Sequence, residues 1–88
     1  MNEPGKGTWV LETISEKKVV GLKQTVRSIE AGEAKLVYIA EDCDMKLKEK
    51  IREIATKKKV KVVMVSSMDE LGEAAGVKVG AATVAILN

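Results

Sequence analysis

Three long polar side chains occur together where one helix of this chain is expected to begin. Gly21 ends a short apolar run and is followed by Lys23, Gln24 and Arg27, with no acidic residue among them. Residues three or four positions apart share a helix face, so these side chains project from one side of the first turns. Cations at a helix N-terminus oppose the helix dipole, at a cost of about 0.3–1 kcal/mol each. Such a set can hold phosphate and read base edges, and the alternative is an ordinary solvated helix face.

A second unusual stretch is "VKVGAA", residues 77–82, in the loop expected before the last strand. Gly76 and Gly80 bracket two apolar residues, Val77 and Val79. One interpretation is ordinary packing where the strand starts. The other is an exposed apolar loop that receives a partner group, such as a base turned out of its stack. The residues alone leave both interpretations open.

The composition excludes several kinds of catalytic and metal site. The chain has no histidine and one cysteine, so His-dependent triads, His-ligand zinc sites and thiolate cages are excluded. The acidic cluster of Glu41, Asp42 and Asp44 lacks the glycine and distal glutamate of a calcium loop, and we interpret it as helix capping and charge placement. Cys43 has no histidine neighbour and is expected to be a small structural residue. We therefore expect no enzyme, no metal and no cofactor.

The charge of the chain is small overall but unevenly distributed. The net charge is +2. Residues 17–35 nevertheless hold five basic residues against two acidic ones, and residues 45–61 hold eight against two. Such segregation creates a basic patch, which the net charge does not reveal. Aromatic residues make up 2% of the chain, which argues against recognition of single strands by base stacking and predicts an aliphatic core.

Hydrophobic periodicity predicts helices that alternate with strands. Helices are expected around residues 9–14 and over 23–31, 45–59 and 67–75, and strands over 18–21, 34–40, 60–65 and 80–88. Asp44 and Ser67 are expected N-caps, Ser67 in the Ser-x-x-Glu spacing of a capping box, while Gly32 and Gly76 are expected beyond helix ends. Alternation of this kind implies crossover connections. The predicted fold is an α/β three-layer α/β/α sandwich with a four-stranded mixed sheet, with residues 1–7 as a flexible N-terminus and 8–88 as a single domain.

Two stretches, "GLKQTVRSIEAGEAKLVYIAEDCD" and "SSMDELGEAAGVKVGAATVAI", resemble the ribosomal protein L7Ae/L30e superfamily. The resemblance covers roughly residues 17–88 and is greatest to the bacterial branch, which has a Gly-x-Lys-Gln signature. Members of this superfamily share the α/β/α sandwich. They clamp the sharp bend of an RNA kink-turn, where tandem sheared G·A pairs follow a three-nucleotide bulge. The resemblance therefore implies a protein that binds kink-turn RNA.

The resemblance also assigns residues to this role. The archaeal and eukaryotic signature Gly-x-Asn-Glu-x-x-Lys falls here on Gly21, Lys23, Gln24 and Arg27, so three polar positions differ from it. A glutamine amide both donates and accepts, so base edges remain readable, and arginine supplies a planar fork of donors. The middle position of the apolar loop is often glutamate in the family and is lysine here. The RNA-binding residues that the resemblance implies are Gly21, Lys23, Gln24, Arg27, Val77, Lys78 and Val79.

Together these observations predict the setting in which the protein acts. We expect a monomer that binds structured RNA, either ribosomal RNA or a riboswitch, in association with the ribosome. The single cysteine, the lack of a charged and then apolar leader, and the short apolar runs predict a cytoplasmic protein without a membrane partner. The alternative function is a protein-interaction or assembly module that uses the apolar loop at residues 77–81.

Overall fold

The computed structural model describes residue 14 and residues 16–88. These residues form three helices and four strands, and the strands make up one sheet. In chain order these are β1 (Lys18–Val20), α1 (Leu22–Glu30), β2 (Ala34–Ala40), α2 (Met45–Lys57), β3 (Lys61–Val65), α3 (Met68–Ala75) and β4 (Thr83–Leu87). The predicted flexible N-terminus, and all but Ile14 of the helix predicted around residues 9–14, lie outside the described residues. None of the described helices is long and apolar enough to cross a membrane.

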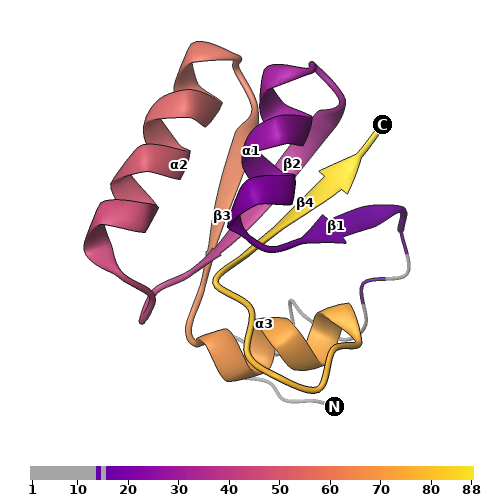
Figure 1. Ribbon diagram of the computed structural model, residues 1–88, viewed down its shortest axis with the longest axis vertical. Coiled ribbons are helices and arrows are strands. Elements are labelled where there is room, and N and C mark those ends of the chain that lie inside the picture. The colour runs from indigo at the N-terminus through magenta and orange to yellow at the C-terminus, as the bar shows by residue number, and fades with distance from the viewer. Residues whose placement is uncertain (1–13, 15) are drawn as a thin grey trace.

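The sheet is mixed, and its strands follow the order β1-β4-β2-β3. β2 and β3 run parallel, whereas β4 is antiparallel to both of its neighbours, β1 and β2. Helices α1 and α2 lie side by side on one face, and α3 packs against β2, β3 and β4 on the other side, at the end where β2 and β3 finish (Figure 1). The predicted α/β fold with a four-stranded mixed sheet is confirmed.

The core between these layers is aliphatic, as the composition predicts. Its largest side chains without any exposed surface come from all three layers of the sandwich. They include Ile29 of α1, Ile51 of α2, Leu71 of α3, and Ile39 and Ile86 of the central strands. Burying a side chain of this size contributes about 1.5–3 kcal/mol, so this interior anchors each helix to the sheet. Ile14 joins the core, and its backbone N–H donates to the carbonyl of Ala74 at 3.0 Å.

The helix ends follow the local sequence closely. The Asp44 carboxylate accepts from the backbone N–H of Lys46 at 2.7 Å, and the Ser67 hydroxyl accepts from that of Glu70 at 3.1 Å. Gly32 and Gly76 have φ angles of +74° and +82°, in the left-handed region that glycine tolerates best. The predicted caps are thus confirmed. One detail differs, because the Glu70 carboxylate bonds the Ser66 hydroxyl instead of completing a reciprocal capping box.

Two element boundaries differ from the prediction for reasons that lie in the backbone. The helix predicted to continue to residue 59 ends at Lys57, because Lys59 adopts a left-handed φ of +59°. The last strand begins at Thr83, three residues later than expected. Before it, the backbone N–H of Ala81 donates to the carbonyl of Met68 at 3.0 Å, so this segment is bonded to the start of α3 and not to a neighbouring strand.

Candidate nucleic-acid interface

Helix α1 begins without a side-chain cap. Gly21 occupies the N-cap position with a φ of +106°, a backbone conformation that L side chains rarely adopt. The first turn contains no acidic residue, whereas α2 and α3 begin with the capping side chains Asp44 and Ser67. The positive end of the α1 dipole therefore lacks an internal anion among the described residues. This helix start is suited to an external anion.

The polar residues predicted at this helix start are on the surface. Lys23, Gln24 and Arg27 are exposed, while Thr25 and Ile29 of the same helix are buried. Among the residues that the structure describes, the only ion pair joins Lys35 to Glu16 at 3.7 Å, so neither Lys23 nor Arg27 is paired with a carboxylate there. Both cations are therefore available to a negatively charged partner.

The apolar loop between α3 and β4 is fixed at both ends to α3. The backbone N–H of Val77 donates to the carbonyl of Gly72 at 3.0 Å, and Ala81 is bonded to Met68 at the start of that helix. Between these anchors Val79 has 74% of its surface exposed, whereas Val77 is half-buried. Val79 therefore presents apolar surface to solvent at a position that the two anchors hold in place.

Gly72 lets this loop lie directly on α3. A Cβ atom at this position would collide with the backbone oxygen of Val79 and would lie 3.0 Å from the Cα atom of Gly80. Glycine inside a helix is less favourable than alanine by about 1 kcal/mol, so its presence in "ELGEAAG" is a signal that a backbone approaches there. Sequence reasoning missed this residue, although that signal could have found it.

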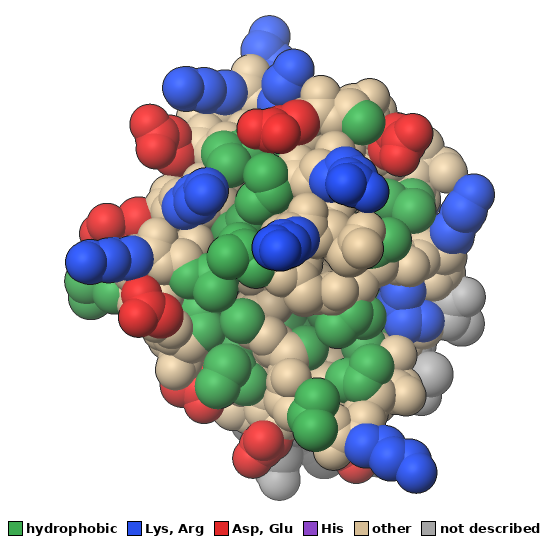
Figure 2. Space-filling model, viewed as in Figure 1, with side chains coloured by type: hydrophobic (Ala, Val, Ile, Leu, Met, Phe, Trp, Pro, Cys, Tyr) green, Lys and Arg blue, Asp and Glu red, His purple; other side chains and the backbone are tan. Residues whose placement is uncertain are grey.

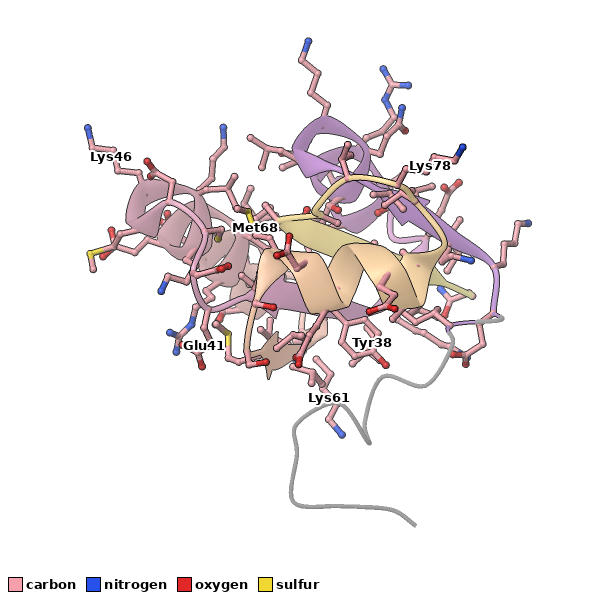
Figure 3. All side chains as sticks on the ribbon, turned by 90° about the horizontal axis from the view of Figure 1, so that it is seen from below. Tyr38, Glu41, Lys46, Lys61, Met68 and Lys78 are labelled. Carbon is pink, nitrogen blue, oxygen red and sulfur yellow. The ribbon has the colours of Figure 1, made fainter. Side chains whose placement is uncertain are left out.

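Thr83, the first residue of β4, connects the start of α1 to the loop. Its carbonyl accepts from the backbone N–H of Gly21 at 3.0 Å, and its hydroxyl lies 2.9 Å from that of Thr25, with neither threonine exposed. Val79 is four residues away along the chain and so within about 14 Å of Thr83. Figure 3 shows Lys78 on the side of the molecule where α1 lies and Lys61 on the opposite side. The two predicted groups of site residues therefore lie at the same end of the fold.

The face that carries α1 and α2 combines apolar and basic surface. In Figure 2 hydrophobic side chains extend across the middle and lower part of this face, Lys and Arg side chains lie mostly over its upper half and middle, and acidic groups lie mostly toward the edge. A hollow of about 420 Å³ beside the loop is lined by Val77, Lys78, Val79 and Gly80, and also by Asp69 and Glu73 of α3. A polyanion is repelled by these two carboxylates, which favours its approach to the loop from the α1 side.

Comparison with known proteins identifies the family. A family model described as the ribosomal protein L7Ae/L30e/S12e/Gadd45 family matches residues 8–88. The chain belongs to this family. The superfamily resemblance found in the two sequence stretches is thereby confirmed.

Named relatives and a solved structure agree with the family. The chain is 48% identical over 72 residues to the RNA-binding protein YbxF of Geobacillus stearothermophilus. The matched stretch covers 82% of this chain and 88% of that protein. It is 40% identical over 77 residues to the large ribosomal subunit protein eL8 of Halobacterium salinarum, covering 86% and 62%. The structure of a 15.5 kD RNA-binding protein of Giardia lamblia superposes with a TM-score of 0.78 at 24% identity, covering 93% and 65%, and supports the fold.

These family relationships also bear on the chemistry. The expectation that this chain is not an enzyme is confirmed by the relatives, whose names denote RNA-binding and ribosomal proteins. Within the described residues, two members of the acidic cluster, Asp42 and Asp44, serve helix ends, as predicted. Asp44 caps α2, and the Asp42 carboxylate accepts from the first N–H of α3, at Met68, at 2.8 Å. Cys43 is buried, and burial raises the pKa of its thiol, which disfavours the reactive thiolate.

The buried hydroxyl pair is expected to stabilise the junction between α1 and β4. Thr83→Val removes one hydroxyl and leaves that of Thr25 buried without this partner, which costs about 1–3 kcal/mol of unfolding free energy in urea titrations. The double variant Thr25→Val plus Thr83→Val should lose less than the sum of the two single variants, because neither hydroxyl then remains unpaired. Strictly additive losses would contradict a direct interaction between the two side chains.

Gly72→Ala tests how closely the loop approaches α3. Alanine gains about 1 kcal/mol of helix propensity, but its methyl group meets the loop backbone, and overpacking of this kind costs about 1–3 kcal/mol. We expect a lower melting temperature and changed amide NMR shifts for residues 77–81. The neighbouring exposed position provides the control, since Glu73→Ala should leave both quantities nearly unchanged. A rise in melting temperature for Gly72→Ala would show that the loop has room to move.

Proposed function

We propose that this protein binds RNA and that its target is a kink-turn. The observation that carries the proposal is the meeting, through Thr83, of the uncapped start of α1 with the loop that exposes Val79. One part offers donors and positive charge, and the other offers apolar surface. Membership of the L7Ae/L30e/S12e/Gadd45 family and the relative named an RNA-binding protein support the same proposal.

The start of α1 supplies the polar half of the proposed contact. Lys23 donates hydrogen bonds only, so it suits the O6 and N7 acceptors of guanine or a phosphate oxygen. The Gln24 amide both donates and accepts, which suits a sheared G·A pair that presents both kinds of group. Arg27 lies one turn further along the exposed face and offers a planar fork for phosphate. Gly21 carries no side chain that would hold the RNA away from the backbone.

The loop supplies the apolar half. An extruded nucleotide exposes both faces of its base to water, and covering one face with Val77 and Val79 removes apolar area from solvent. Lys78 is exposed between them and is placed to contact the sugar–phosphate backbone. Because the loop is bonded to α3 at both ends, little conformational entropy is lost when it binds. The loop therefore acts as a preformed support for the bulged nucleotide.

The biological setting that we propose follows from the same comparison. The family description and the relative named a large ribosomal subunit protein favour association with the ribosome in the cytoplasm. The RNA would then be ribosomal RNA, with a riboswitch kink-turn as the other source of the same motif. All the residues of the proposed RNA contact come from one copy of the chain. We therefore propose that the protein binds RNA as a monomer.

A titration with two RNAs tests the proposal. The purified protein should bind a kink-turn RNA at least tenfold more tightly than the same RNA with its G·A pairs replaced by Watson–Crick pairs, because each lost base-edge contact costs about 1–3 kcal/mol. Fluorescence anisotropy at fixed salt measures both affinities. Equal and weak binding to the two RNAs would remove the proposed function and leave the assembly module that uses the loop at residues 77–81.

Lys23→Ala combined with Gln24→Ala tests the residues at the helix start. Both side chains are exposed, so the double variant should keep its melting temperature while its affinity for the kink-turn falls at least tenfold. Lys61→Ala, which removes one charge on the opposite side of the molecule, is the matched control and should change affinity little (Figure 3). A large loss of stability in the double variant, without selective loss of kink-turn binding, would indicate a structural role for these residues.

A further inference from the structure

The surface beside the proposed site continues into a groove between α1 and α2. This α1–α2 groove has a volume of about 670 Å³. Its lining residues are Leu22, Lys23, Val26, Arg27, Glu30, Ala31 and Lys50. Two of the cations in this lining, Lys23 and Arg27, also belong to the proposed RNA contact. The groove is therefore continuous with that contact, and α2 adds a third cation from across the groove.

Helix α2 contributes more positive charge than its own structure uses. The helix, residues 45–57, holds five basic residues and two acidic ones, and none of these bases forms an ion pair with a carboxylate in the described part of the chain. Lys46 and Lys50 are four residues apart and so share one face of α2. Figure 3 shows Lys46 on the same side of the molecule as Lys78, the side where α1 lies. The basic face of α2 is thus turned in the same direction as the proposed site.

We propose that the α1–α2 groove holds the sugar–phosphate backbone of an RNA arm that continues from the bend, with Lys50 as a phosphate contact. This inference rests on the proposed function and extends its footprint to a second helix. Cations on both walls of the groove match a phosphate chain. The apolar part of the lining near the start of α1, Leu22 and Val26, matches the carbon faces of riboses.

The lining of the groove favours the backbone over a stacked base. None of its lining residues is aromatic, and proteins that stack successive bases do so mainly on aromatic side chains. Glu30, the one acidic residue of the lining, is the last residue of α1. Because a carboxylate repels phosphate, the RNA strand crosses the first two turns of α1 and leaves the groove before that end.

Charge removal at Lys50, combined with RNAs of different arm length, tests this inference. Lys50→Gln should weaken binding to a long-armed kink-turn RNA about five- to tenfold at 0.1 M salt and reduce the slope of log Kd against log salt by about 0.7–0.9, because one fewer counterion is released. Lys61→Gln makes the same change on the opposite side of the molecule and should alter affinity less than twofold. Each arm is then shortened to a few base pairs in turn. Shortening the arm that lies in the groove should weaken the affinity of wild type by about the same five- to tenfold, whereas the affinity of Lys50→Gln should fall no further.

These outcomes distinguish failure of the groove proposal from failure of the function on which it rests. If wild type prefers the kink-turn over the G·A-replaced RNA but Lys50→Gln behaves like Lys61→Gln, the groove proposal is wrong and the proposed function stands. The groove proposal is also wrong if shortening either arm weakens wild type and Lys50→Gln equally. If wild type does not distinguish the two RNAs, both proposals fail. A melting temperature within about two degrees of wild type verifies that Lys50→Gln is folded.

Discussion

The candidate site depends on one junction, the hydrogen bonding of Thr83 to the start of α1. The Gly21 N–H donates to the Thr83 carbonyl, and the Thr25 and Thr83 hydroxyls are hydrogen-bonded to each other. Neither threonine has exposed surface. Buried polar groups are stable only when they are paired, so this junction has little freedom to rearrange. It fixes the beginning of a helix against the residue that directly follows the apolar loop.

The sheet topology explains why this junction exists. β4 is antiparallel to both β1 and β2, so its first residue lies at the end where β1 and β2 finish. Gly21 follows β1 directly and opens α1, while the loop at residues 77–82 leads directly into β4. If β4 ran parallel to β1 and β2, it would begin at the opposite end of these strands, and the loop would then lie far from the start of α1. The direction of one central strand therefore decides whether the site can form.

Charge and fixed geometry have different roles on the surface that carries the candidate site. The uncapped start of α1 and the basic residues of α2 attract a polyanion over distances of about 10 Å, the Debye length at ordinary salt. Such attraction is sequence-independent. Discrimination has to come from fixed geometry, and here the fixed parts are the helix start and the loop anchored to α3. A small aliphatic core suffices for this purpose, because it sets the relative position of both parts.

The sequence alone determined the local structure of this protein. Asp44 and Ser67 capped the predicted helices and Gly76 ended one, because capping depends on a side chain and the few residues beside it. The hydrophobic pattern likewise determined an α/β fold. Only the tertiary structure decided that Thr25 meets Thr83, 58 residues away, and that Gly72 lies under the loop. Those contacts depend on strand order and direction, which local patterns do not encode, since hydrogen bonds between distant strands form only when the whole sheet assembles.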